Sequence, residues 1–262
     1  MIKVGFIGVG NMGSALARAV AKTEKADILL FDTNTLLSEK LSDELNCRAV
    51  SLSEIAAADI VFLGVKPNII PTVCRELDSA GAARDTLIIS MAAGVDIASI
   101  SSCFTVEHPI IRIMPNTPVS VGEGMILWCA NKKGEGRSAD FESIMQNAGV
   151  IDKIPERLID AASAISGCGP AFAFMFIEAI ADGGVKCGLP REKALLYAKK
   201  MLKGAASLAD LSDLHPGELK DKVCSPGGST IAGVCALEDG AFRSTVIAAV
   251  ESSYEKTLEL GK

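Results

Sequence analysis

The stretch that most restricts how this chain can fold is a glycine motif near the N-terminus, Gly8-Val9-Gly10-Asn11-Met12-Gly13. The apolar residues 2–7 predict a short strand before it, and an alanine-rich pattern over 14–22 predicts a helix after it. In that setting the first glycine permits a tight turn, the second lets the backbone approach a pyrophosphate, and the third lets helix and strand pack closely. The order of strand, glycine turn and helix therefore predicts a dinucleotide-binding unit rather than an incidental turn.

A carboxylate follows at the position where such a unit recognises the adenosine ribose. Residues 28–31 predict the second strand, and Asp32 ends it, about 20 residues past the glycines. An acid there accepts hydrogen bonds from a ribose and repels a 2′-phosphate, which favours NADH over NADPH. Thr33, Asn34 and Thr35 are still able to contact a phosphate, so both cofactors stay open.

Strands and helices continue to alternate through the first half of the chain. The predicted strands are 60–65, 87–90, 110–113, 122–130 and 150–154, the predicted helices are 53–57, with Ser53 as its cap, and 137–146, and 130–136 is expected to be an exposed loop. Such alternation is typical of an α/β Rossmann domain with a doubly wound, mainly parallel sheet.

Small and polar residues follow several of these strands. In a doubly wound sheet, ligands bind at the carboxyl ends of the strands, so we expect these residues to border the cofactor. Together with the acid Asp32 and the turn residues Gly8, Gly10, Asn11, Met12 and Gly13, the expected cofactor contacts are Val65, Lys66, Pro67, Ala92, Ala93, Gly94, Asn116, Thr117 and Pro118.

The second half of the chain shows only helical patterns. Its predicted helices are 156–166, 171–183, 191–208 and 242–258, with Gly167-Cys168-Gly169-Pro170 as an interruption that kinks the helix. We therefore divide the chain into a cofactor domain, 1–155, and an all-helical domain, 156–262. The uncharged run 161–177 is too short and too interrupted for a membrane span, so a buried helix is expected. The amount of apolar helix surface predicts burial in a symmetric dimer.

A second loop motif, Ser225-Pro226-Gly227-Gly228-Ser229-Thr230, lies between two predicted helices. Its glycines free the backbone to approach a ligand, and Ser229 and Thr230 stand where a helix begins, as N-cap residues do. A helix start offers unpaired N–H groups to an anion such as a carboxylate. Taken alone, the motif can equally be a tight turn between two helices.

The net charge and the cysteines indicate which binding partners and which cellular location to expect. The net charge is −6 and no run of Lys or Arg occurs, so neither nucleic acid nor an anionic membrane is an expected partner. The N-terminus carries no expected signal peptide, because glycines interrupt its apolar run. The 8 cysteines form no C-x-x-C pair, which predicts reduced, mostly buried thiols in a cytoplasmic protein. The two isolated histidines agree with the expectation of a site without a metal.

Five motifs occur in an order that resembles pyrroline-5-carboxylate reductase over essentially the whole chain. They are Phe6 to Gly13, Val65-Lys66-Pro67, Arg112 to Pro118, Ser166 to Ala171, and Ser225 to Thr230. The resemblance implies a Rossmann domain joined to an all-helical domain that dimerises, in many relatives into larger rings, with the active site between the domains. It also implies hydride transfer from NADPH or NADH to the C=N carbon of 1-pyrroline-5-carboxylate, which gives L-proline.

The same resemblance implies roles for the second loop motif. Thr230 matches the threonine whose hydroxyl supplies a proton to the ring nitrogen. The substrate carboxylate would rest on backbone N–H groups of the loop, which makes Ser225, Gly227, Gly228, Ser229 and Thr230 the expected substrate-binding residues. The chain departs from many relatives at Asp32, where they carry a neutral residue, at Cys168, usually serine, and at Phe172, commonly tyrosine.

Two alternatives compete with this assignment. A β-hydroxyacid dehydrogenase also joins a Rossmann domain to helices, but it needs a lysine in a G-x-x-x-K-x-x-N context, and the nearest candidate, Lys186, lacks the asparagine. A catalytically silent cofactor-binding sensor would keep the glycine motif, yet it would have no reason to retain residues 225–230.

Overall fold

The computed structural model describes residues 1–260 and resolves them into two compact units. One unit holds Met1–Cys168 together with the chain from Ser253 on, and the other holds Gly169–Ser252.

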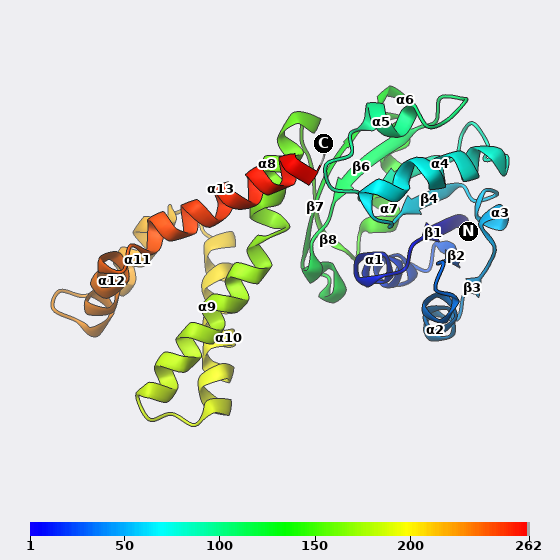
Figure 1. Ribbon diagram of the computed structural model, residues 1–262. Helices are drawn as coiled ribbons and strands as arrows, with labels where there is room; N and C mark the ends of the chain where they lie inside the picture. The colour runs from blue at the N-terminus through cyan, green and yellow to red at the C-terminus, as the bar shows by residue number, and fades with distance from the viewer. Residues whose placement is uncertain (261–262) are drawn as a thin grey trace. The chain divides into compact units, whose positions relative to one another are not determined.

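The first unit is built on an 8-stranded sheet in the order β3-β2-β1-β4-β5-β6-β7-β8 (Figure 1). The strands are β1 (Ile2–Ile7), β2 (Ala26–Phe31), β3 (Arg48–Ala49), β4 (Ile60–Leu63), β5 (Leu87–Ser90), β6 (Ile110–Met114), β7 (Gly124–Ala130) and β8 (Gly149–Lys153). Neighbours pair in parallel except β6 and β7, which are antiparallel. β1 pairs with both β2 and β4, so the strand order reverses at β1. This confirms the predicted doubly wound, mainly parallel sheet and puts its switch point beside the glycine motif.

Helices cover both faces of this sheet. They are α1 (Asn11–Ala21), α2 (Thr35–Leu45), α3 (Leu52–Ile55), η1 (Pro67–Ile69), α4 (Ile70–Ser79), α5 (Ile97–Ser101), η2 (Thr117–Val121), α6 (Lys132–Glu135), α7 (Ser138–Met145) and α8 (Glu156–Ser166). Apolar residues of α1, α2 and α7 pack against one face, and those of α3, α4, α5 and α8 pack against the other.

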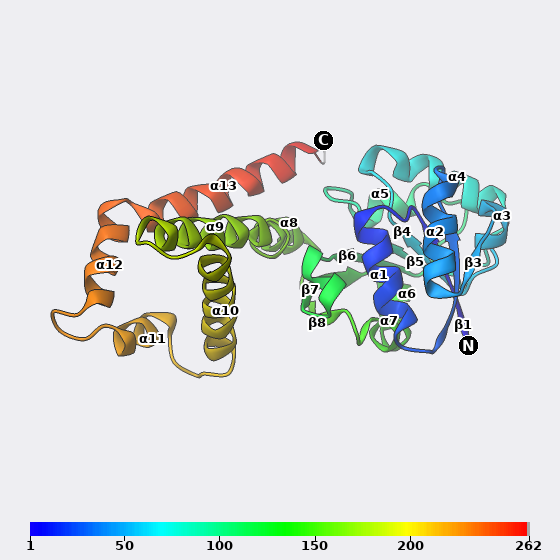
Figure 2. The ribbon, with the colours of Figure 1, turned by 90° about the horizontal axis from the view of Figure 1, so that it is seen from below.

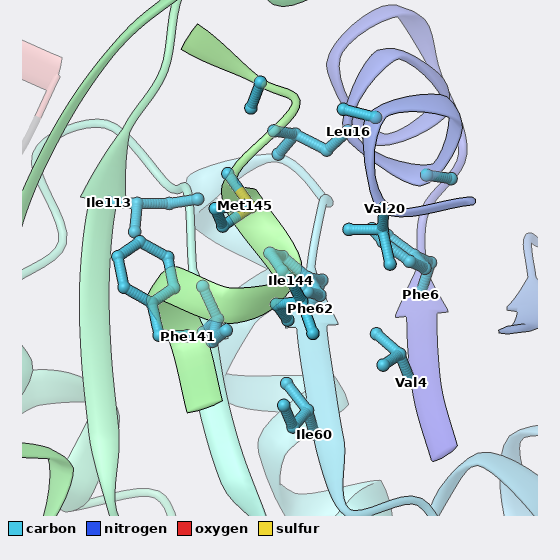
Figure 3. Packing of buried hydrophobic residues seen from close by; sticks show 14 of the residues in the cluster. Val4, Phe6, Leu16, Val20, Ile60, Phe62, Ile113, Phe141, Ile144 and Met145 are labelled. Carbon is cyan, nitrogen blue, oxygen red and sulfur yellow. The ribbon is translucent and has the colours of Figure 1, made fainter. Parts of the chain in front are cut away.

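Alternation along the strands feeds the two cores. Phe6 of β1 and Phe62 of β4 stack with ring centroids 4.6 Å apart in one core, beside Leu16 and Val20 of α1 (Figure 3). Ile7, the next residue along β1, belongs to the opposite core. Because both faces are covered, the strands read as continuous apolar runs in the sequence.

Two local predictions need correction. The cap of α3 is Ser51 and not Ser53, because Glu54 completes a capping box by accepting from the Ser51 backbone N–H at 3.0 Å. The predicted loop 130–136 contains the helix α6, in which Asn131 caps Gly134 by accepting its N–H at 2.7 Å. Gly134 is buried, since a Cβ there would lie 2.3 Å from the carbonyl oxygen of Ile110.

An ion cluster fastens α8 to the sheet. The buried guanidinium of Arg112, on β6, donates from Nη2 to Oδ1 of Asp160 at 2.6 Å. Its Nη1 lies 3.5 Å from Oε1 of Glu156, which also accepts the backbone N–H of Ile97 at 2.8 Å. Ile159 between the two acids is fully buried. Charge pairing and apolar packing therefore hold the same face of α8 on the sheet.

The second unit is all-helical, as predicted. Its helices are α9 (Gly169–Lys186), α10 (Arg191–Asp210), α11 (Pro216–Val223), α12 (Ser229–Asp239) and the first part of α13 (Phe242–Leu260) (Figures 1 and 2). α9 and α10 share a small core of Ala181, Ala194 and Ala198. The sequence had indicated a kink at Gly167-Cys168-Gly169-Pro170. Pro170 is instead the second residue of α9, so it begins this helix and does not kink a helix interior.

Much apolar surface of this unit is exposed in the single chain. Phe174 and Met175 of α9 are 64% and 68% exposed, and Tyr197 of α10 is 54% exposed. Within residues 1–260, the stretch Glu156–Lys186 is also long and apolar enough for a membrane span by composition alone. Its first part, α8, packs on the sheet, but α9 buries only Ala181, so the expected buried helix over 161–177 is wrong for α9 in the single chain. Large apolar side chains are also exposed on α10 and α13, as expected of helices that meet a second copy.

The 8 cysteines are all free, but the expectation that most are buried is wrong. Only Cys74 and Cys129 are buried, and burial raises the pKa of each thiol to about 12. Cys187, in the turn after α9, and Cys235, on α12, are exposed.

Asp160→Asn should destabilise the first unit strongly. The change removes the negative charge that lies 2.6 Å from the buried Arg112 guanidinium and leaves Glu156, 3.5 Å away, as its one ion-pair partner within residues 1–260. Removing one partner of a buried ion pair typically costs about 3–5 kcal/mol in the free energy of unfolding, whereas an exposed pair contributes less than about 1 kcal/mol. Asp27→Asn, which breaks the exposed pair with Arg48, is the matched control. Urea unfolding of both variants tests the difference, and equal losses would show that the cluster does not anchor α8.

The protein should become less stable as the pH is lowered, because of His108. Its ring is buried, Nδ1 lies 3.4 Å from the Thr86 carbonyl oxygen, and Nε2 has no partner among residues 1–260. Burial lowers the pKa of His108 below its ordinary 6.5, so the unfolded chain binds a proton more readily than the folded one. The contribution of His108 to the free energy of unfolding is therefore fully present above pH 6.5. It is lost as the pH falls from 6.5 towards the folded pKa, by at most about 1.4 kcal/mol per pH unit.

His108→Gln should flatten this dependence between pH 7.5 and 5.5, whatever its effect on absolute stability. Urea midpoints at several pH values measure both slopes. Parallel slopes in the wild type and the variant would show that His108 takes its proton equally well in both states.

Candidate active site

The glycine turn between β1 and α1 is shaped by close approach of three backbone segments. Gly8 has φ +88°, and a Cβ there would lie 2.7 Å from the carbonyl oxygen of Gly64, at the end of β4. A Cβ on Gly13 would lie 2.1 Å from the carbonyl oxygen of Gly8. Only glycine satisfies both positions, so the turn and the start of α1 are tied directly to β4.

Gly10 is a glycine for a different reason. A Cβ there would meet no protein atom within 4 Å, so the space in front of it is open. Gly10 is also the N-cap of α1, no side chain caps this helix, and its first turn carries no acid. The N–H groups of Asn11 and Met12 thus stand at a bare, positive helix end that suits the pyrophosphate of a dinucleotide.

Asp32 is fixed by two backbone hydrogen bonds. Its Oδ2 accepts the N–H of Val9 at 2.8 Å, and its Oδ1 accepts the N–H of Asn34 at 2.9 Å. The first bond joins the end of β2 to the glycine turn, and the second holds the start of the next loop. The carboxylate is thereby oriented beside the turn, with lone pairs left for ribose hydroxyls.

A cavity of about 470 Å³ lies at the switch point of the sheet. It brings together Gly8, Gly10, Asp32, Val65 and Lys66, which the sequence had indicated from three separate segments. Its remaining lining residues include Ile69, Thr72, Val73 and Glu76, which the sequence analysis missed. Their spacing on η1 and α4 is the helical 3 and 4, a signal that becomes readable once a helix is placed after Lys66-Pro67.

The other expected cofactor residues do not line this cavity. Asn11, Met12 and Gly13 begin α1 and Pro67 begins η1, while the rest lie after β5 and β6. Ala92 is buried in the core, and Gly94, with φ +73°, turns the chain after Ala93. Asn116 is 7% exposed, and its amide is used within the protein: Oδ1 accepts the N–H of Met125 and Nδ2 donates to the Ser166 carbonyl oxygen, both at 2.9 Å. Thr117 and Pro118 begin η2.

The second loop motif forms a tight turn before α12. The N–H of Gly228 donates to the Ser225 carbonyl oxygen at 3.0 Å, and Gly227 has φ +69°, which a proline followed by glycine favours. The N-cap is Gly228, so the expectation that Ser229 and Thr230 are cap residues is wrong. They are the first two residues of α12, and their backbone N–H groups and the exposed Thr230 hydroxyl stand at the helix start.

Gly10→Ala and Gly13→Ala should separate binding from folding. The first adds a methyl group in open space and should leave thermal stability close to wild type while weakening NADH binding at least about tenfold. The second forces a methyl group against the Gly8 carbonyl and should cost about 1–3 kcal/mol in stability. Thermal unfolding and NADH fluorescence titration measure the two effects. Tight NADH binding by Gly10→Ala would show that the dinucleotide does not lie close to the backbone of Gly10.

Comparison with known proteins agrees with this geometry. The family model described as pyrroline-5-carboxylate reductase dimerisation matches residues 156–260, and the model described as NADP oxidoreductase, coenzyme F420-dependent, matches residues 3–94. The two matches cover the second loop motif and the glycine turn, respectively.

Individual relatives match along the full chain. The pyrroline-5-carboxylate reductase of Synechocystis sp. is 41% identical and covers 100% of this chain and 99% of its own length. Pyrroline-5-carboxylate reductase 2 of Homo sapiens is 39% identical and covers 99% of this chain and 84% of its own length. The crystal structure of Plasmodium falciparum pyrroline carboxylate reductase with NADP bound superposes with a TM-score of 0.88 at 35% identity, covering 100% of this chain and 98% of that one. The chain belongs to the pyrroline-5-carboxylate reductase family.

Proposed function

We propose that this protein reduces 1-pyrroline-5-carboxylate to L-proline, the last step of proline biosynthesis. The observation that carries the proposal is that a member of this family has both a cavity beside the glycine turn at the sheet switch point and, in its second unit, a glycine turn that opens α12. When bound, reduced nicotinamide supplies the hydride that adds to the C=N carbon. The ring nitrogen gains a proton, so the imine becomes a secondary amine.

The first unit holds the cofactor. Asp32 accepts the ribose hydroxyls, and the bare end of α1 receives the pyrophosphate. The remaining contacts come from the ends of β4, β5 and β6, with Asn116 acting through the loop that its amide holds. The proposed cofactor-binding residues are Gly8, Gly10, Asn11, Met12, Gly13, Asp32, Val65, Lys66, Pro67, Ala92, Ala93, Gly94, Asn116, Thr117 and Pro118.

The turn before α12 binds the substrate. The backbone N–H groups of Ser229 and Thr230, at the start of α12, are suited to the substrate carboxylate, and this contact orients the ring for hydride addition. Residues Ser225, Gly227, Gly228, Ser229 and Thr230 form this contact. Thr230 is the proposed catalytic residue, because its exposed hydroxyl stands at the same helix start as the carboxylate-binding N–H groups and can donate to the ring nitrogen.

NADH is the proposed preferred cofactor. Asp32 is held by Val9 and Asn34 beside the glycine turn, so its charge cannot turn away from a 2′-phosphate without breaking two hydrogen bonds. The described lining of the cavity holds a second carboxylate, Glu76, against one amine, Lys66. The relative from Plasmodium falciparum binds NADP, so this chain would differ from it in preference.

The protein self-associates through its dimerisation region, and the exposed apolar faces of α9, α10 and α13 supply the surface. We propose that dimers assemble further into a ring. Cofactor binding is assigned to residues 1–155, and dimerisation and substrate binding to 156–262, although α8 packs on the sheet of the first unit. The free thiols support a cytoplasmic location.

The two alternatives are less favoured. Lys186 is the last residue of α9 and lacks the partner asparagine that β-hydroxyacid dehydrogenase chemistry requires. A silent sensor would bind NADH and be stabilised by it without turning over the imine, so turnover distinguishes it directly.

Thr230→Val and Thr230→Ser form a matched pair for the catalytic step. Valine keeps the shape and removes the hydroxyl, so kcat for the imine should fall by at least about 100-fold, while the Kd for NADH changes little. Serine keeps the hydroxyl and should stay within about tenfold of wild type. Imine-dependent oxidation of NADH, followed at 340 nm, measures both.

Two results would contradict these assignments. Normal turnover by Thr230→Val would remove the proton-donor role from Thr230 but leave the reductase intact. Absence of imine-dependent oxidation with both NADH and NADPH, in a wild-type protein that binds NADH, would overturn the reductase itself.

A further inference from the structure

One wall of the cofactor cavity is formed by a helix face on η1 and α4. Ile69, Thr72, Val73 and Glu76 all line the cavity, and their spacing puts them on one side of η1 and α4. Val73 is part of the core, so this side of the helix is packed against the sheet and held in place. The helix face is therefore fixed in position, and it presents the exposed side chains of Thr72 and Glu76 to whatever enters the cavity beyond Asp32.

The apolar part of this wall suits a flat ring. Ile69 is 41% exposed although it lines a cavity, and Val65 lies at the end of β4 in the same lining. An exposed isoleucine in a cavity gains most when a flat apolar surface covers it. In a dinucleotide whose adenosine ribose is bound by Asp32, the base is the group that extends from that ribose.

The polar part offers one acceptor and one adaptable hydroxyl. Neither the Glu76 carboxylate nor the Thr72 hydroxyl has a hydrogen-bond or ion-pair partner within residues 1–260. The two residues are four apart on α4, which places them side by side on the helix surface. Adenine presents the donor N6–H₂ beside ring-nitrogen acceptors along its edge, which complements this pair.

We propose that Glu76 and Thr72 recognise the amino edge of the adenine ring, with Glu76 accepting from N6 and Thr72 donating to a neighbouring ring nitrogen. This role rests on the proposed binding of a nicotinamide adenine dinucleotide in the cavity. Glu76 carries the discrimination, because an ionised carboxylate only accepts hydrogen bonds, whereas a hydroxyl can exchange donor for acceptor. A base with an oxygen in place of the amino group would set two acceptors against each other at Glu76.

The test compares NADH with reduced nicotinamide hypoxanthine dinucleotide, in which O6 replaces the adenine amino group. Both ligands carry the same charge, so any general effect of Glu76 on the potential of the cavity cancels in their ratio. Binding is measured by nicotinamide fluorescence without imine, so the result does not depend on turnover. Wild type should bind NADH at least about tenfold more tightly than the hypoxanthine analogue.

Glu76→Gln keeps the shape and supplies an amide that can both donate and accept, so the ratio of Kd values should fall to within about threefold of one. Glu142→Gln, an exposed change on α7 outside the cavity lining, is the control and should keep the wild-type ratio. Thr72→Val should weaken both ligands and leave most of the ratio in place.

An unchanged ratio in Glu76→Gln, an equal change in Glu142→Gln, or a wild-type ratio near one would each overturn the proposal. A ratio that depends on Glu76 in a protein that does not reduce the imine would uphold the base contact and reject only the proposed reaction. Normal turnover of the imine, with the same ratio of Kd values in Glu76→Gln as in the wild type, would reject the base contact and leave the proposed reaction intact.

Discussion

The hydrogen bond from the Val9 N–H to the Asp32 carboxylate, 2.8 Å long, is the contact on which the cofactor-binding side of this protein depends. It joins the end of β2 to the glycine turn, while the N–H of Gly64 donates to the Ile7 carbonyl oxygen at 2.7 Å and joins the turn to β4. The turn is thus held from both neighbouring strands. Its conformation aims the bare end of α1, and its two flanking strands form the sides of the cavity.

The same carboxylate has a structural and a chemical task, and this limits how the site can vary. An uncharged residue at position 32 could accept a 2′-phosphate, but it would anchor the turn through weaker hydrogen bonds, because bonds to a charged acceptor are about twice as strong as neutral ones. A preference for NADH would then follow from how the turn is built as much as from recognition of the ribose.

The helical side of the protein poses a different physical problem. The packed core shared by α9 and α10 consists of small alanines, while large apolar side chains of those helices stay exposed in the single chain. Such a unit gains most of its apolar burial from a second copy. Its stability should therefore increase with the concentration of the protein. α8 does not share this dependence, because Arg112, Asp160 and Ile159 bind it to the sheet.

The sequence predicted those parts of the structure that depend on local patterns. The glycine turn, Asp32 at the end of β2 and the strand β5 follow from spacing and apolar runs that tertiary contacts do not alter. The cap of α3 also has a local sequence signal, because Ser51 and Glu54 have the three-residue spacing of a capping box. The nearby Ser53 was chosen as the cap instead.

What the sequence could not predict depends on long-range contacts. Gly134 looked like a loop residue, and it is buried only because its backbone lies against Ile110 on β6. Asn116 looked like a free rim residue, although its amide is bonded to Met125 and to Ser166, which lies 50 residues further along the chain. Glu76 was missed because its place in the cavity depends on the rotation of α4 about its axis, which packing of Val73 into the core fixes.

The ratio of kcat/KM for NADH to that for NADPH, measured on the wild-type protein with 1-pyrroline-5-carboxylate, tests the account most directly. A fixed carboxylate beside the glycine turn predicts a ratio above about ten, since each tenfold change corresponds to about 1.4 kcal/mol of differential stabilisation. A ratio below one would show that the site accommodates a 2′-phosphate despite Asp32, and it would contradict the role given to that residue.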